Sequence, residues 1–150
     1  MEQKLNEKLA IIQSELKTAK TRYNSFGKYK FRSAEDILNA LKPFLIKYGV
    51  SVRIKEKLVH TNIIRSTAII YDGTEEITAT ALVGVDTNQK GMQMPQRFGA
   101  ASSYGKKYAL GNLFLIDDTQ DSDATNNHVK ANRTKLSNGE DPNAWRDQWK

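Results

Sequence analysis

The sequence of 150 residues contains no cysteine, which excludes disulfide scaffolds, thiolate zinc sites and cysteine nucleophiles. Its two histidines, His60 and His128, are too few and too far apart in the sequence to indicate a zinc site. The GxxxxGKS/T motif, which holds the phosphates of a bound nucleotide, is also missing. We therefore expect no cofactor, no ATP hydrolysis and no enzymatic role.

The sequence also lacks a hydrophobic run of roughly 20 residues, the length that a membrane-spanning helix needs. Charged residues are scattered through the N-terminal segment MEQKLNEKLAIIQSEL, which is unlike a signal peptide. We therefore expect a soluble, cytoplasmic protein that has no membrane partner.

Positive charge is concentrated in one part of the chain. Residues 1–116 contain 18 Lys and Arg against 10 Asp and Glu, whereas residues 117–150 contain 5 against 7. A basic domain is typical of proteins that bind a polyanion such as nucleic acid. From residue 120 onward the apolar residues are isolated and follow no period. The sequence predicts one domain over residues 1–119, which binds DNA and oligomerises, and a flexible, mildly acidic tail over residues 120–150.

Two amphipathic patterns predict helices in the first third of the chain. The second of them begins after Ser33, which forms a capping pair with Asp36, and ends at Gly49. Pro43 lies inside it and removes one backbone hydrogen bond, which predicts a kink. The first helix is indicated by an apolar stripe at alternating steps of four and three residues, formed by Leu5, Leu9, Ile12 and Leu16.

In the middle of the chain the apolar period changes to two, which is typical of strands. An alternating pattern begins at Val50, a run rich in β-branched residues covers 63–71, and a second alternating pattern covers 77–85. Asp72 and Gly73 between the last two patterns are a strong hairpin signal. These segments predict a three-stranded antiparallel meander.

The remaining segments complete the predicted fold. We expect a short extended piece near residues 29–31, a loop over 86–94 and a last helix from Gln96 to Leu113, with Pro95 in its first turn. The whole pattern predicts an α+β fold, in which helices pack on one face of a small curved antiparallel β-meander.

The first predicted strand carries a row of cations. Because side chains alternate along a strand, Arg53, Lys55 and Lys57 lie on the face opposite Val52 and Ile54. The row is either a DNA-binding surface or the solvated face of an edge strand, whose lysines prevent pairing with another chain. A single strand does not decide between these alternatives.

Just before the second helix, cations alternate with aromatic rings. Lys28, Lys30 and Arg32 interleave with Tyr29 and Phe31. Cations follow the phosphates of a nucleic acid while rings stack on its bases, so the three cations are candidate DNA contacts. The alternative is that the two aromatic residues belong to the core of a short strand.

The segment PQRFGAASSYGKKYALGNLF predicts a helix with two different faces. Lys106 and Lys107 supply charge, Ser102 or Ser103 supplies a hydroxyl donor, and small residues let a phosphate backbone approach closely. The alternative is tight helix packing through Gly99, Ala100 and Ala101. At about 100° per residue, the small basic face comprises Arg97, Ala100, Ser103, Tyr104, Lys107 and Gly111, and the other face comprises Phe98, Gly105, Ala109 and Leu113.

These residues carry a resemblance to a known family. The segment SFGKYKFRSAEDILNALKPFLIKYG, followed by PQRFGAASSYGKKYALGNLFLIDD, resembles the essential recombination function (ERF) family of phage single-strand annealing proteins. The resemblance extends from the first predicted helix to Asp118 and leaves the tail outside. It implies a protein that pairs complementary DNA strands without ATP, acts in the bacterial host cell and assembles into rings or filaments.

The ERF family is grouped with the eukaryotic ring-forming annealing proteins, in which a helix with a Lys-Arg-Ala-Leu-like run lines the DNA groove. Lys106, Lys107, Tyr108, Ala109 and Leu110 are similar to that run. The resemblance implies that the two lysines contact phosphates. It also implies single-stranded DNA and the annealed duplex intermediate as partners, together with a single-strand binding protein and an exonuclease. We expect the three basic segments to form one continuous cationic groove.

Other functions stay open at this point. The cations and aromatic rings also suit a protein that coats single-stranded DNA or RNA without annealing it. A metal-dependent nuclease is a further alternative, since Asp117, Asp118, Asp121 and Asp123 supply clustered ligands for Mg²⁺. These carboxylates begin the predicted tail, however, where nothing would hold them rigidly.

The tail contains two tryptophans, Trp145 and Trp149, which would share one side of a short helix. They are either anchors for a partner such as a single-strand binding protein or part of an unstructured end.

Overall fold

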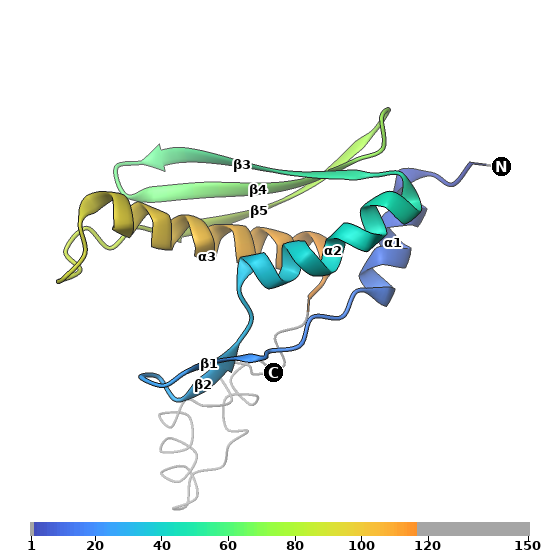
Figure 1. The fold of residues 1–150 in the computed structure, drawn as a ribbon. Helices are drawn as coiled ribbons and strands as arrows, with labels where there is room; N and C mark the ends of the chain where they lie inside the picture. The colour runs from blue at the N-terminus through green and yellow to red at the C-terminus, as the bar shows by residue number, and fades with distance from the viewer. Residues whose placement is uncertain (1, 117–150) are drawn as a thin grey trace, which may run out of the picture. The chain divides into compact units, whose positions relative to one another are not determined.

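The computed structural model describes residues 2–116, which form three helices and two small antiparallel sheets (Figure 1). The helices are α1 (Leu5–Glu15), α2 (Ala34–Tyr48) and α3 (Met94–Phe114), and the strands are β1 (Arg22–Asn24), β2 (Tyr29–Phe31), β3 (Ser51–His60), β4 (Ile63–Tyr71) and β5 (Glu76–Gly84). The predicted α+β class is therefore confirmed. None of the helices within these residues is long and apolar enough to cross a membrane.

The larger sheet is the predicted meander, with strand order β3-β4-β5 and both pairs antiparallel. Asp72 stabilises the turn between β4 and β5, because its carboxylate accepts hydrogen bonds of 2.9 and 2.8 Å from the backbone N–H groups of Thr74 and Glu75. Gly73 has a φ of +99°, a conformation that favours glycine. The Asp72-Gly73 pair thus forms the hairpin turn that the sequence predicts.

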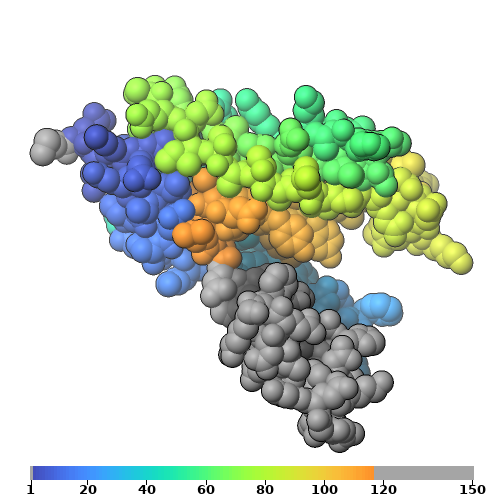
Figure 2. Space-filling view, turned by 180° about the vertical axis from the view of Figure 1, so that it is seen from behind, coloured from blue at the N-terminus to red at the C-terminus, as the bar shows by residue number. Residues whose placement is uncertain are grey.

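All three helices lie on the same side of the larger sheet (Figure 1). The helix α3 packs directly against β4 and β5, and both α1 and α2 contact α3. Figure 2 shows α1 beside the end of α3, where the side-chain amide of Gln13 donates a hydrogen bond of 2.8 Å to the carbonyl of Leu113. The predicted stripe of α1 is buried in the core: Leu5, Leu9, Ile12 and Leu16.

Both ends of α2 are formed by the predicted residues. The Ser33 hydroxyl accepts a hydrogen bond from the backbone N–H of Asp36, and the Asp36 carboxylate accepts one from the backbone N–H of Ser33. Gly49 ends the helix with a φ of +64°. The helix runs through Pro43 as one continuous element.

The helix α3 begins at Met94, slightly before the predicted Gln96. Gln93 and Gln96 form a capping pair like that of α2, in which the Gln96 side-chain oxygen accepts a hydrogen bond of 3.0 Å from the backbone N–H of Gln93. The predicted loop over 86–94 therefore ends one residue earlier, at Gln93.

The predicted extended piece is strand β2, which pairs antiparallel with β1 in a separate two-stranded sheet. No pattern in the sequence predicts β1, because its three residues are polar or aromatic without a period. In the turn, the side-chain oxygen of Asn24 accepts hydrogen bonds of 3.0 Å from the backbone N–H groups of Phe26 and Gly27. The β1–β2 hairpin projects from the start of α2, away from the larger sheet (Figure 1).

Close contact between α3 and the larger sheet depends on Gly105. The residue is buried against β4, and a Cβ atom at this position would lie 2.1 Å from the Oγ atom and 3.1 Å from the Cβ atom of Ser66. Ser66 is fully buried, and its hydroxyl has no hydrogen-bond partner among residues 2–116. Ala101 and Ala109 flank Gly105 on the same buried face. Ala101, Gly105 and Ala109 therefore serve packing, whereas Gly99, which the packing alternative included, is exposed and has open space around its Cβ position.

We expect the Gly105→Ala substitution to destabilise the protein. The added methyl group overlaps Ser66, and overpacking of a core costs roughly 1–3 kcal/mol. The higher helix propensity of alanine offsets about 1 kcal/mol of this cost. Urea denaturation measures the change in the free energy of unfolding.

Gly99→Ala is the matched control, because a Cβ atom there would meet no other atom within 4 Å. We expect this control to leave the protein as stable or to stabilise it by up to about 1 kcal/mol. Adding Ser66→Ala to Gly105→Ala should restore part of the lost stability. Equal effects of the two glycine substitutions would contradict the packing role of Gly105.

Candidate nucleic-acid interface

The side of α3 that faces the β1–β2 hairpin carries a lysine between two tyrosines. The ammonium group of Lys107 lies 5.1 Å from the ring centroid of Tyr104 and 5.6 Å from that of Tyr108. The two rings stack on each other at 6.2 Å, and each residue is about half exposed to solvent. A cation over an aromatic face is attracted by the ring. This arrangement places a positive charge and two flat apolar rings on the same side of α3.

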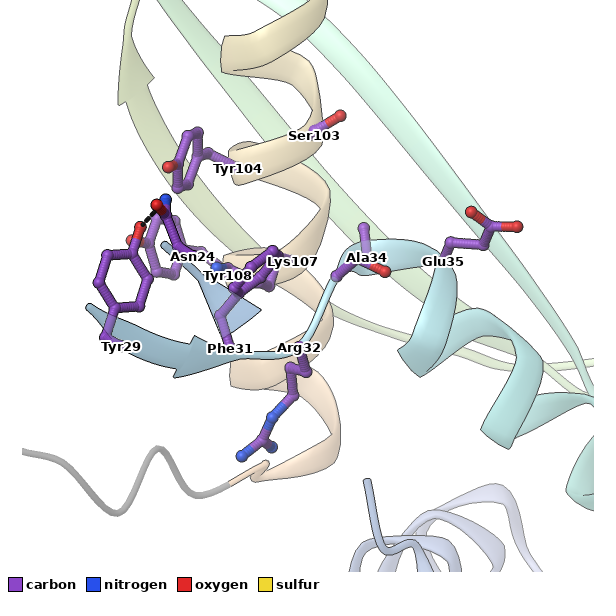
Figure 3. A pocket seen from close by; sticks show the side chains of 11 residues that line it. Asn24, Tyr29, Phe31, Arg32, Ala34, Glu35, Ser103, Tyr104, Lys107 and Tyr108 are labelled. Atoms are coloured by element: carbon purple, nitrogen blue, oxygen red, sulfur yellow. Dashed lines mark hydrogen bonds between the residues drawn. The ribbon is translucent and has the colours of Figure 1, made fainter. Parts of the chain in front are cut away.

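A pocket of about 550 Å³ lies between this part of α3, the hairpin and the first turn of α2 (Figure 3). We call it the tyrosine groove. Its lining comprises Asn24, Tyr29, Phe31 and Arg32 from the hairpin and its end, Ser33, Ala34 and Glu35 at the start of α2, and Ser103, Tyr104, Lys107 and Tyr108 from α3. Aromatic rings, a cation and the N-terminus of a helix thus converge, a combination that suits bases and phosphates.

The aromatic residues of the hairpin are on its surface, which decides against the core alternative for Tyr29. Tyr29 is 43% exposed and packs edge-on against the partly buried ring of Phe31, with the ring centroids 6.1 Å apart. The hydroxyl of Tyr29 accepts a hydrogen bond of 3.1 Å from the Asn24 amide (Figure 3). Phe26, at the turn of the hairpin, is 98% exposed. The hairpin therefore presents rings that bases can reach.

The three candidate cations of this segment differ in position. Lys28 and Lys30 are exposed on the hairpin, and neither is among the residues that line the tyrosine groove. Lys30 alternates with Tyr29 and Phe31, so it points to the opposite side of β2. Arg32 is buried, and its guanidinium points away from the tyrosine rings in Figure 3.

Lys106 points to a different side of α3 from Lys107. Its ammonium group lies 3.7 Å from the carboxylate of Glu56 on β3, which also accepts a hydrogen bond of 2.6 Å from the Ser102 hydroxyl. The two lysines therefore face different surfaces of α3, and the implied contact of each with a phosphate stays a prediction. Adjacent helical residues are about 100° apart, and only Lys107 lines the groove, where Ser103 rather than Ser102 also lies.

Arg97 holds a loop in place. Its guanidinium donates hydrogen bonds to the backbone carbonyls of Thr87 and Gln89, in the segment that connects β5 to α3. This arginine was a candidate DNA contact, but its hydrogen bonds give it a structural role at the far end of α3 from the tyrosine groove.

Arg53, Lys55 and Lys57 are exposed on β3 as predicted, but they do not extend the groove. Val52 and Ile54, which alternate with them, pack against the core on the side of the helices. The three cations therefore lie on the face of the sheet that no helix covers (Figure 1). The expected single cationic groove is wrong, since the basic segments occupy two separate surfaces.

An ion pair joins the hairpin to α2. The Arg22 guanidinium donates hydrogen bonds of 2.9 and 3.0 Å to the two carboxylate oxygens of Asp36, which also caps the helix. The bidentate pair fixes one wall of the tyrosine groove, and the sequence analysis did not find it because 14 positions separate the two residues. The hydrogen bonds from Arg22, and then that from the backbone of Ser33, hold the pKa of Asp36 well below its usual range.

Comparison with known proteins agrees with the ERF resemblance of the sequence. The family model described as the ERF superfamily matches residues 5–148. The chain belongs to the ERF superfamily. The essential recombination function protein of Salmonella phage P22 is 41% identical over 145 residues, a match that covers 91% of this chain and 70% of that protein. No solved structure matches the chain.

The ERF match reaches further than the resemblance noted in the sequence, which ended at Asp118. It extends to residue 148 and so includes the segment that the sequence analysis left outside the family. The predicted boundary at residues 119 and 120 and the predicted tail lie outside the described residues. The same holds for the acidic cluster Asp117, Asp118, Asp121 and Asp123, and for Trp145 and Trp149. Within residues 2–116, no three acidic or histidine side chains come together as ligands for a metal ion.

We expect the Arg22–Asp36 pair to make stability pH-dependent. A lowered pKa in the folded state means that the carboxylate stabilises the fold above the unfolded pKa of about 3.9, and that this contribution is lost as the pH falls below it. The difference in the free energy of unfolding between the native chain and Asp36→Asn should therefore be constant above about pH 5 and shrink between about pH 4 and about pH 2. A difference that stays constant over this range would contradict the prediction.

Proposed function

We propose that this protein binds single-stranded DNA in the tyrosine groove and promotes ATP-independent annealing of complementary strands during phage recombination. Membership of the ERF superfamily and the name of the P22 relative support the role in phage recombination. The observation that supports DNA binding is the position of Lys107 over Tyr104 and Tyr108, opposite the exposed aromatic residues of the hairpin.

The groove offers contacts that do not depend on base sequence. An ammonium group attracts any phosphate, and a tyrosine ring stacks on any base. Binding of this kind is sensitive to salt, because it releases counterions from the DNA. A strand held through its backbone on a basic surface repels an incoming strand less, and base pairing then selects the complement. Such a mechanism needs no nucleophile, metal ion or nucleotide, so we infer a binding protein rather than an enzyme.

Self-assembly into a ring or filament is part of this proposal and rests on the family resemblance. An assembly would hold one strand along successive copies of the groove, which multiplies weak contacts from single subunits. A host or phage single-strand binding protein and an exonuclease would supply the strands to be annealed.

The test is the rate at which two complementary labelled oligonucleotides pair, measured by fluorescence energy transfer without nucleotide or divalent metal. We expect the native protein to accelerate pairing strongly. Lys107→Gln should weaken binding to a single strand about tenfold, because a hydrogen bond to a charged group contributes roughly 1.5 kcal/mol, and annealing should slow accordingly. The slope of log K against log salt should become less steep by about 0.7, because one phosphate contact is lost.

Lys42→Gln removes the same charge from the exposed surface of α2 and serves as the matched control. Lys106→Gln should have a much smaller effect than Lys107→Gln, because Lys106 does not line the groove and lies beside Glu56 on β3. Tight binding without acceleration of pairing would make the protein a coating protein. Equal losses in Lys106→Gln and Lys107→Gln would contradict the groove, and shortened strands would indicate a nuclease.

A further inference from the structure

The face of the larger sheet that points away from the helices is basic across two strands. The register pairs Lys55 with Thr67 and Lys57 with Arg65, and Arg53 lies one step further along β3. Lys55, Lys57 and Arg65 are exposed, and no carboxylate within residues 2–116 lies at ion-pair distance from them. We call this the open face, and Arg65 is a member that the sequence analysis did not single out.

The open face carries one carboxylate, at its edge. Glu76 lies 3.8 Å from the guanidinium of Arg53, which also lies over the ring of Tyr71 at 5.3 Å. Arg53 is thus engaged by its neighbours, whereas the other three cations form an uncompensated group. Thr67 and Thr80 pair with each other next to Lys55 and add hydroxyl donors to the same face.

Protection of a sheet edge does not account for this group. Lysines on an outer strand are a common device against pairing with another chain, and they would explain Lys55 and Lys57. Arg65, however, lies on β4, the central strand, which has partners on both sides and no free edge to protect. A cation on each of two neighbouring strands instead forms a surface that suits an extended polyanion.

The open face and the tyrosine groove lie on opposite sides of the sheet. The helices, and the hairpin that completes the groove, are all on the other side (Figure 1). A nucleic-acid chain in the groove therefore cannot also lie on the open face of the same subunit without passing around the sheet.

We propose that the open face is a second phosphate-binding surface, which holds the backbone of a second DNA strand while the tyrosine groove holds the first. The proposal rests on the function proposed above and extends it. Successive cations on β3 are two residues apart, about 7 Å, which is comparable with the separation of neighbouring phosphates along a DNA strand. The exposed part of the face offers cations, hydroxyls and the side chain of Leu82 beside Arg65, without stacked rings. It therefore contacts the backbone and leaves the bases available for pairing.

The experiment measures capture of a second strand. A biotinylated oligonucleotide is fixed to a surface and saturated with protein, and a labelled oligonucleotide that is not complementary to it is then added at increasing salt. We expect the native protein to capture the second strand. The Lys55→Gln/Lys57→Gln/Arg65→Gln variant should bind the first strand within about twofold of the native protein, yet lose roughly tenfold or more in capture of the second strand.

The matched control is Lys17→Gln/Lys42→Gln/Lys90→Gln, which removes the same charge from exposed positions outside both surfaces. This control should capture the second strand almost as the native protein does. Circular dichroism and urea denaturation verify that both variants are folded.

The outcomes separate this proposal from the previous one. Unchanged capture by the open-face variant, or equal losses in the variant and the control, would overturn the second surface and leave the tyrosine groove as it stands. Failure of the native protein to bind even the first strand would overturn the proposed function itself. Loss of first-strand binding in the open-face variant, with Lys107→Gln unaffected, would make the open face the primary site and overturn both assignments.

Discussion

The close approach of α3 to the sheet is the constraint on which the other features depend. Gly105 leaves room for Ser66, and the small side chains of Ala101 and Ala109 let α3 lie close to the sheet along the rest of the contact. Because this contact is specific, it fixes the rotation of the helix about its own axis. The rotation in turn decides that Lys106 faces Glu56 and that Lys107 faces the hairpin. A packing detail in the core therefore decides which of the two lysines lines the tyrosine groove.

The larger sheet lies between two surfaces that carry cations, the tyrosine groove and the open face. The side of the sheet that faces the helices also forms part of the hydrophobic core. Its helix-facing residues are apolar, apart from Ser66 and Glu56, and its other face carries most of the charge of β3. Placing like charges on opposite faces reduces their mutual repulsion, since it puts them further apart. The fold thus accommodates a strongly basic domain without concentrating its cations in one place.

Features encoded by neighbouring residues could be predicted from the sequence. The Ser33–Asp36 cap, the Asp72-Gly73 turn and the alternation of the strands all follow from local geometry. The sequence also indicated residues that the structure brings together in the tyrosine groove, namely rings and a cation near Tyr29 and Lys107. It did not indicate which of them meet, because that depends on contacts between distant segments. The partner of Lys106 is 50 positions away, and Arg97 binds carbonyl groups, which have no signature in the sequence.

The hairpin forms its own small sheet and shares no strand pairing with the larger one. Two residues, Arg32 and Ser33, connect it to α2, and the Arg22–Asp36 pair supports it from the outside. One wall of the tyrosine groove is therefore held by the chain connections and side-chain contacts of the hairpin, without strand pairing to the larger sheet. A change in the width of the groove would therefore break side-chain contacts such as the Arg22–Asp36 pair and leave the strand pairing of the larger sheet intact.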